Sequence, residues 1–159
     1  MDTLWAPWRM SYVASAGPPP VCVFCAAVAG SDDRSSLVLY RGALAFLILN
    51  AFPYASGHLM AATTRHGGSL EDSSSAELTE TMELVQRGIR ALRGTYRPDG
   101  FNVGVNHGRV AGAGVPDHLH VHVVPRWNGD TSFMPVLGNV KVLPEHLHAT
   151  RERLREAWS

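Results

Sequence analysis

The sequence has no excess of charge of either sign and no strongly basic segment. Its 14 Lys and Arg residues balance 14 Asp and Glu residues, so the formal net charge is zero. Long nucleic acids and anionic membranes are attracted by basic surfaces, and we expect neither as a partner. A small phosphorylated ligand stays open, because a few basic side chains and backbone amides aimed at one point can bind it.

Segments for membrane insertion or export are also lacking. The longest apolar runs, such as residues 43–49, are far shorter than the ~20 residues that span a bilayer. Residues 1–9 have neither the basic segment nor the apolar stretch of a signal peptide. We therefore expect a soluble, cytoplasmic protein.

The chain of 159 residues, 45% of them hydrophobic, is long enough for one compact domain with a sizeable core. Residues 1–20 are rich in Pro, Gly and Trp and show no helical or strand periodicity. We expect them to form an N-terminal arm, followed by a single domain over residues 21–159. The tryptophans of such an arm need cover, from the same subunit or from a second one.

The central part of the chain predicts a mixture of strands and one long helix. Ser74 and Glu77 form a capping box at the start of residues 74–96. The helix that follows repeats apolar residues at three-to-four spacing; they are Leu78, Met82, Val85, Ile89 and Leu92. Strands are expected at residues 36–40, 43–50, 58–63, 101–105 and 118–125, and a short terminal helix at residues 144–157. The prediction is an α+β fold with an antiparallel sheet of about five strands.

Three histidines alternate with apolar residues at His118, His120 and His122, which places them on one face of a strand. The strand rise puts the backbones of His118 and His122 ~13 Å apart, so the three histidines cannot easily bind one ion. Neighbours two residues apart are only ~6.6 Å apart and can share an ion, so a metal-dependent hydrolase with a His-x-His zinc chelate is one interpretation.

The other interpretation gives the three histidines separate roles. A neutral imidazole can attack phosphorus if a hydrogen bond to its second nitrogen fixes the tautomer, and His120, in the middle, is the expected nucleophile. A glycine-rich loop over residues 108–116 comes directly before the strand. Its bare backbone amides can approach phosphate oxygens, so we expect Arg109, Gly112 and Gly114 at the substrate.

Residues 118–124 match the His-φ-His-φ-His-φ-φ signature, with φ an apolar residue, and the chain resembles the histidine triad family of nucleotide hydrolases and transferases. The resemblance covers roughly residues 22–127. Further landmarks stand in the family's usual order: Leu49-Asn50, Pro53, Gly57-His58-Leu59-Met60 and Asn102-Val103-Gly104. The flanks at residues 5–9, 125–130 and 133–136 look like a bacterial branch often labelled diadenosine tetraphosphate hydrolase or phosphorylase.

This resemblance implies a histidine triad fold and a covalent nucleotidyl intermediate on His120, formed from a dinucleoside polyphosphate or a related adenine nucleotide. It also implies that His122 contacts the phosphates and that Asn50 hydrogen-bonds the ribose. An Asn at a strand end can instead cap the following turn. His58 is expected to be structural, with a buried hydrogen bond. Members of the family usually form dimers, and we expect a homodimer.

The chain departs from the family's pattern at one position. Many hydrolases of the family carry a glutamine about four residues before the first histidine of the triad, where it orients the transferred phosphoryl group. Gly114 occupies that place here. The departure weakens the expectation of water as the acceptor, favours inorganic phosphate, and leaves a nucleotide-binding protein with a weak site as an alternative.

Cysteine is scarce, and the two copies, Cys22 and Cys25, are three positions apart, which suits a metal site or a redox pair better than a structural disulfide. A branch of the family has a structural zinc site whose ligands match Cys22, Cys25, His66 and His118, and four such ligands form a closed tetrahedron. Free thiols and a redox pair are the alternatives. The redox pair is disfavoured because no clear helix pattern follows the cysteines.

Overall fold

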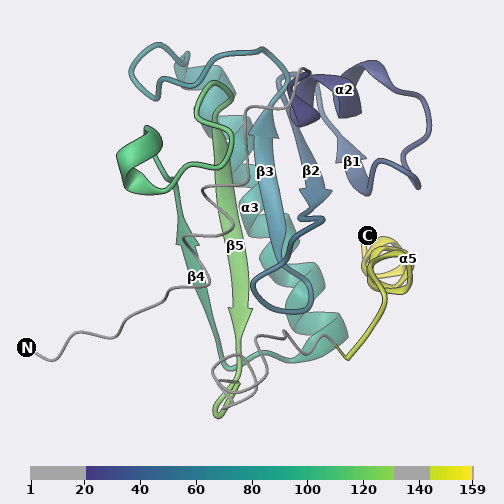
Figure 1. The fold of residues 1–159 in the computed structure, drawn as a ribbon. Coiled ribbons are helices and arrows are strands. Elements are labelled where there is room, and N and C mark those ends of the chain that lie inside the picture. Colours follow the sequence, from purple (N-terminus) through teal and green to yellow (C-terminus); the bar gives the residue numbers. More distant parts are fainter. Residues whose placement is uncertain (1–20, 131–143, 159) are drawn as a thin grey trace, which may run out of the picture.

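The structure is a computed structural model that describes residues 21–130 and 144–158 (Figure 1). The expected N-terminal arm, residues 1–20, and the flank at residues 133–136 lie outside the described residues. The division of the chain into an arm and one domain therefore stays a prediction.

Five antiparallel strands form one sheet in the order β1-β2-β3-β5-β4. Their bounds are Val38–Arg41 for β1, Ala45–Leu49 for β2, Leu59–Thr63 for β3, Gly100–Gly104 for β4 and His120–Arg126 for β5. This confirms the predicted sheet. Strand β5, which carries the histidines, lies inside the sheet between β3 and β4, so both of its edges are hydrogen-bonded.

The long helix α3, Ser75–Tyr96, covers one face of the sheet (Figure 1). The predicted capping box is present, since the Ser74 hydroxyl accepts from the Glu77 N–H and the Glu77 carboxylate accepts from the Ser74 N–H. The three-to-four spacing of apolar residues predicts that they face the core. Val85 and Leu92 do so, whereas Met82 is 48% exposed, so this prediction is partly wrong. The buried side of α3 includes Gly88, which brings the helix against the Leu47 and Leu59 side chains.

The opposite face of the sheet is covered in part by α2, Val23–Ala29, a short helix that the sequence did not predict. Adjacent residues of β2 point to opposite faces. Phe46 packs against Phe24 of α2, whereas Leu47 faces α3.

The predicted terminal helix is α5, Leu147–Glu156. No helix within the described ranges 21–130 and 144–158 is long and apolar enough to cross a membrane.

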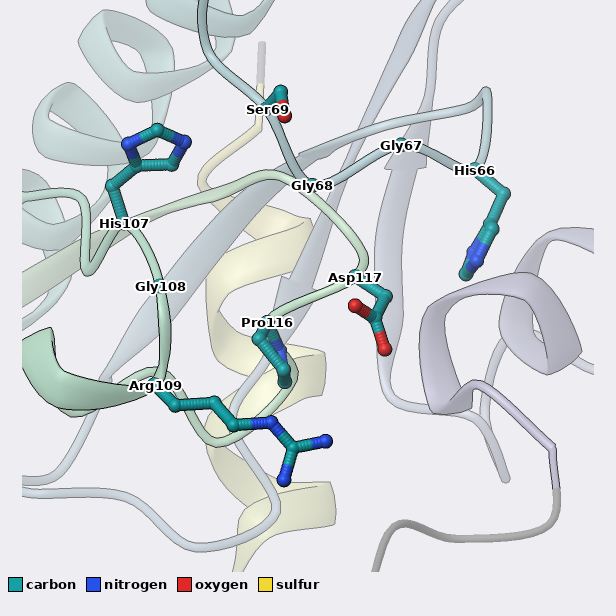
Figure 2. A pocket seen from close by; sticks show the side chains of 9 residues that line it. All are labelled: His66, Gly67, Gly68, Ser69, His107, Gly108, Arg109, Pro116 and Asp117. Atoms are coloured by element: carbon teal, nitrogen blue, oxygen red, sulfur yellow. The ribbon is translucent and has the colours of Figure 1, made fainter.

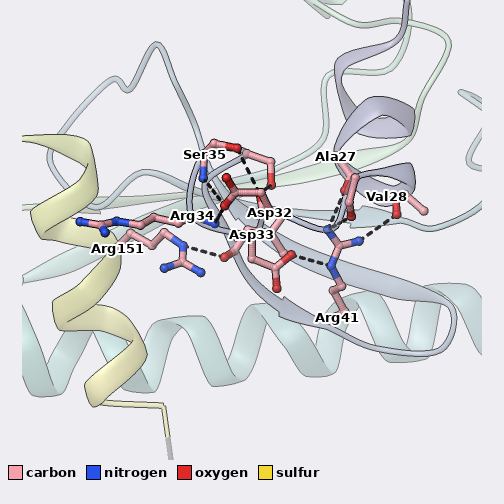
Figure 3. A network of polar contacts seen from close by, with 11 residues as sticks. Ala27, Val28, Asp32, Asp33, Arg34, Ser35, Arg41 and Arg151 are labelled. Carbon is pink, nitrogen blue, oxygen red and sulfur yellow. Dashed lines mark hydrogen bonds and ion pairs between the residues drawn. The ribbon is translucent and has the colours of Figure 1, made fainter.

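Two arginines attach these shorter helices to β1 (Figure 3). Arg41 donates to the carbonyl oxygens of Ala27, Val28 and Gly30 at the end of α2, at 2.7, 2.9 and 3.0 Å, and its Nε donates to Asp33 at 2.7 Å. Buried Arg151 of α5 donates to the Val38 carbonyl oxygen at 2.8 Å. A helix of seven residues has little stability of its own, so α2 depends on such tertiary contacts.

Candidate active site and metal centre

The side chains of His118 and His120 lie on the α2 side of the sheet, under the ring of Phe24. Its ring centre is 5.0 Å from that of His118 and 4.8 Å from that of His120. Strand β5 begins at His120 rather than at the predicted residue 118, because His118 lies in a bend that leads into the strand. Both histidines are buried, whereas His122 is partly exposed.

A hydrogen bond fixes the tautomer of His120. Its Nδ1 lies 2.8 Å from the backbone carbonyl oxygen of His118. A carbonyl oxygen only accepts, so Nδ1 carries the proton and Nε2 keeps an unprotonated lone pair. Burial lowers the pKa of His120, which further favours the neutral ring. His120 thus has the protonation state that a nucleophilic imidazole needs.

His122 has the opposite tautomer, because it is paired with His58. The backbone N–H of Tyr54 donates to His58 Nδ1 at 3.0 Å, so the proton of His58 is on Nε2. That Nε2–H donates to His122 Nδ1 at 2.9 Å, which places the proton of His122 on its own Nε2. Burial, together with the neighbouring His120, lowers the pKa of His122 to about 4. His122 therefore presents a neutral N–H donor beside the lone pair of His120.

The structure adds a role for His58 that sequence reasoning missed. His58 was expected to be structural with a buried hydrogen bond, and it is fully buried and hydrogen-bonded. In addition, it orients His122, which is 64 residues away in the sequence. The pairing depends on the register of β3 against β5, and no local sequence signal points to it.

Asn50 lies at the end of β2, next to the same group. Its Oδ1 accepts from the Phe52 N–H at 2.8 Å, so the side chain caps the turn that follows β2. Its Nδ2 lies 3.4 Å from His58 Nδ1. The ribose contact of Asn50 stays a prediction.

The glycine-rich loop contains a single 3₁₀ turn, Arg109–Ala111, flanked by Gly108 and Gly112 with positive φ angles of 84° and 89°. Arg109 lines a pocket of about 640 Å³ together with His107, His66 and Asp117 (Figure 2). Gly112 and Gly114 are exposed and do not line it.

The irregular segment of residues 66–69 lines the same pocket. At Gly68, an added Cβ would lie 2.0 Å from the Pro116 carbonyl oxygen, so only glycine allows this approach. The Leu119 N–H donates to the Gly67 carbonyl oxygen at 2.7 Å. These contacts hold residues 67 and 68 against the entry to the histidine strand.

The second cluster consists of Cys22, Cys25, His66 and His118, whose potential ligand atoms all lie within 4.8 Å of one another. The sequence prediction thus named four residues that the fold brings together. His118 Nε2 donates to the Thr63 carbonyl oxygen at 2.7 Å, which leaves the Nδ1 lone pair facing the thiols. His66 Nδ1 lies 3.2 Å from Cys25 Sγ. Two thiols and two imidazoles are a donor set that fits zinc.

The helix α2 begins directly after Cys22, so the expectation that no helix follows the cysteines is wrong. Both sulfur atoms face the ring nitrogen of His118, as two ligands of a single metal ion would. Within the described part of the chain, the group of ligands within reach of one ion contains neither His120 nor His122. This separation favours distinct roles for the histidines over a catalytic His-x-His chelate.

Comparison with known proteins places this chain in a family. The sequence profile of the HIT domain matches residues 32–129. The AP-4-A phosphorylase of Mycobacterium tuberculosis is 40% identical over 167 residues, which cover 100% of this chain and 85% of the relative. The adenosine 5'-monophosphoramidase hnt1 of Schizosaccharomyces pombe is 27% identical over 84% of this chain and 95% of its own.

A crystal structure of a Zn-bound histidine triad family protein from Mycobacterium smegmatis superposes with a TM-score of 0.70 and 30% identity, over 86% of this chain and 92% of that one. Its fold, like that of the described residues here, supports the histidine triad arrangement predicted from the sequence. The protein belongs to the HIT domain family, the histidine triad family.

Proposed function

We propose that the protein is a nucleotide hydrolase or transferase that acts on dinucleoside polyphosphates through a covalent nucleotidyl-His120 intermediate. The observation that carries this proposal is the pair of opposite tautomers, with a lone pair on His120 Nε2 and a proton on His122 Nε2. A nucleophile and a hydrogen-bond donor side by side suit attack on a phosphate. The name of the M. tuberculosis relative, AP-4-A phosphorylase, supports the same substrate class.

In the first step, His120 Nε2 attacks the α-phosphorus, and the bond from phosphorus to the bridging oxygen breaks. The nucleoside polyphosphate leaves as an anion with the electron pair of that bond. The His122 Nε2–H donates a hydrogen bond to the phosphate oxygens and stabilises their charge. In the second step, an acceptor oxygen attacks the same phosphorus, the N–P bond breaks, and His120 returns to its neutral state.

The acceptor that we propose as the better candidate is inorganic phosphate. Gly114 has no side chain with which to position water, and Arg109 faces a pocket beside the loop. Incubation with diadenosine tetraphosphate, with and without phosphate, identifies the acceptor. ADP with ATP is expected in the presence of phosphate, whereas AMP with ATP would show hydrolysis. Two ADP, or no products at all, would contradict attack at the α-phosphorus.

The nucleophile is tested with His120→Ala, which should abolish turnover and keep most of the nucleotide affinity. His148→Ala is the matched control, because that histidine is exposed on α5. Quenching of the wild-type reaction with denaturant at alkaline pH, where the P–N bond of a nucleotidyl-histidine persists, followed by mass spectrometry, should find one nucleotidyl group on a peptide that contains His120. Turnover by His120→Ala near the wild-type rate would overturn the assignment.

We also propose that Cys22, Cys25, His66 and His118 hold a structural zinc ion that joins α2 to the start of β5. The support is the donor set and the inward Nδ1 atom of His118. Such a site would stabilise the fold, while His120 stays free for chemistry. Two free cysteines in a metal site agree with a reducing compartment, and a cytoplasmic location is proposed on that ground.

A homodimer is proposed through the outer edge of the sheet. Strand β4 is an edge strand, and Val103 on it is 44% exposed. Val103, Leu78, Met82 and Leu70 line an apolar cavity of about 360 Å³ between α3 and β4. An apolar edge of this kind needs cover by another chain. Sedimentation should show a dimer that Val103→Lys dissociates; an unchanged mass for that variant would refute this interface.

A further inference from the structure

Two side chains of opposite charge line the pocket beside the histidine strand without pairing with each other. They are Arg109 and Asp117, and Figure 2 shows both pointing into the same opening, between the glycine-rich loop and the purple helix α2. Within residues 21–130 and 144–158, neither side chain has a hydrogen-bond or ion-pair partner. Both charged groups are therefore available to a ligand.

The other ionisable side chains of the pocket already face partners in the protein. His66 Nδ1 lies 3.2 Å from Cys25 Sγ, in the proposed metal group. His107 Nε2 lies 3.4 Å from a carboxylate oxygen of Glu71. This leaves Arg109 and Asp117 as the two groups of the pocket that can select a ligand.

The rest of the wall favours a ligand with phosphates and hydroxyl groups. Gly67, Gly68 and Gly108 contribute bare backbone, and among the described residues no Phe, Tyr or Trp lines the pocket, so a base finds no large ring on which to stack. An arginine binds phosphate oxygens, and a carboxylate accepts hydrogen bonds from hydroxyl groups such as the two of a ribose. The volume of about 640 Å³ is that of a small-molecule site.

The position of the pocket relates it to the proposed nucleophile. Asp117 comes three residues before His120, which is ~10 Å along an extended chain. The pocket opening and the His120 side chain are both on the α2 side of the sheet. A substrate whose α-phosphorus meets His120 can therefore extend its further phosphates past Arg109 and bring its second nucleoside to Asp117.

We propose that this pocket binds the second nucleotide of the substrate, with Arg109 on its phosphates and Asp117 on its ribose hydroxyls. The proposal rests on the proposed function, since it needs a substrate with two nucleosides. Asp117 repels a terminal phosphate in the same place, so this carboxylate selects dinucleoside polyphosphates over mononucleotides. Once the leaving nucleotide has departed, its place beside Arg109 is open to inorganic phosphate as the acceptor.

The test compares diadenosine tetraphosphate with adenosine 5'-tetraphosphate, which has the same four phosphates and no second nucleoside. Binding to the His120→Ala protein, measured by calorimetry, makes the comparison independent of turnover. Loss of a hydrogen bond to a charged group costs about 10-fold or more in affinity. Asp117→Ala should therefore weaken binding of diadenosine tetraphosphate by about 10-fold, but not binding of adenosine 5'-tetraphosphate, whose terminal phosphate the carboxylate repels.

Arg109→Ala should weaken both ligands alike, because both carry the phosphates. Asp117→Asn, which keeps the shape and one oxygen acceptor, should lose less affinity for diadenosine tetraphosphate than Asp117→Ala. Glu83→Gln and Arg90→Ala are the matched controls, because both residues are exposed on α3.

Equal losses with the two ligands in Asp117→Ala, or no loss with diadenosine tetraphosphate, would overturn the assignment of the pocket. So would full affinity for both ligands in Arg109→Ala. If wild type turned over neither compound but the binding preference behaved as expected, the proposed function would fail while the pocket assignment stood.

Discussion

The Nε2 atom of His58 lies 2.9 Å from the Nδ1 atom of His122, and the two rings are 5.1 Å apart. Because the Tyr54 N–H occupies the other nitrogen of His58, the direction of this hydrogen bond is set from the backbone. The proton that His122 can offer to a phosphate therefore depends on a residue that does not itself reach the substrate.

Replacement of His58 should lower kcat more than it raises KM. In His58→Ala, His122 Nδ1 loses its donor, and the ring can adopt the tautomer that has no Nε2–H. We expect kcat to fall by about 100-fold, within the range for loss of a positioned proton donor. Steady-state kinetics measure the fall, and ¹⁵N NMR of the imidazole nitrogens reports the tautomer of His122.

His148→Ala on α5 controls for the loss of any histidine. A kcat within twofold of wild type, together with an unchanged NMR tautomer, would show that His58 does not position His122.

The stability of the protein should depend on pH through His122. An ordinary histidine titrates near pH ~6.5, whereas burial and His120 lower the pKa of His122 to about 4. Between these values the unfolded chain binds a proton that the folded chain does not. The free energy of unfolding should therefore be fully developed above about pH 7 and should decrease as the pH falls from about 6.5 toward about 4.

Urea unfolding between pH 4 and 8 measures this dependence. In His122→Gln, the side chain at position 122 does not titrate, so the free energy of unfolding should decrease less between about pH 6.5 and about pH 4 than in wild type. Identical pH profiles for the two proteins would contradict the assignment to His122.

Removal of the metal should lower the thermal stability of the protein without abolishing turnover. Protein purified without chelators should contain about one zinc per chain, and Cys22→Ser should lose it, because a tetrahedral site needs all four ligands. Chelation should lower Tm while turnover at low temperature persists. Mass spectrometry of the metal content and thermal unfolding are the measurements.

Absence of zinc from such a preparation would exclude the structural site. Immediate loss of turnover on chelation, with Tm unchanged, would favour instead a hydrolase with a catalytic metal.

The hydrogen bonds from Arg41 to the end of α2 give a further prediction. Arg41→Ala removes three hydrogen bonds to the helix end and the ion pair with Asp33. Hydrogen bonds to charged groups contribute about 1.5–3 kcal/mol each, but these are partly exposed, so we expect a total loss of about 2–4 kcal/mol. Arg41→Lys should recover little, because an ammonium group cannot reach several carbonyls at once.

Urea denaturation measures the loss, and hydrogen exchange should be faster at the amides of α2. Arg34→Ala is the control, since that side chain is 71% exposed and makes a long contact of 3.7 Å with Glu152. Equal losses of unfolding free energy in Arg41→Ala and Arg34→Ala would mean that the Arg41 hydrogen bonds to α2 do not stabilise the protein.

Much of this arrangement could be predicted from the sequence, because it is encoded locally. The capping box at Ser74 and Glu77 marks the start of α3, and the alternation from His118 to His122 marks a strand. The proposed metal ligands are predicted only through the resemblance to a family pattern, since Cys25 and His66 come together only in the fold.

The errors have physical reasons. Helix α2 is too short for an apolar period, and contacts from outside hold it. Met82 fits the helical period, but it lies on the side of α3 that extends past the sheet toward the cavity beside β4. The pairing of His58 with His122 depends on strand register, which no single segment encodes.

That register has a consequence for folding errors. His120 lies opposite Ala62, and His122 lies opposite Met60. If β5 paired one residue out of place with its side chains reversed, Leu119, Val121 and Val123 would face α2, and the imidazoles would be pushed into the apolar layer under α3. Such a chain would lose the proposed nucleophile His120, its neighbouring donor His122 and the proposed metal ligand His118 in a single event. Misfolded molecules of this protein should therefore be wholly inactive rather than partly active.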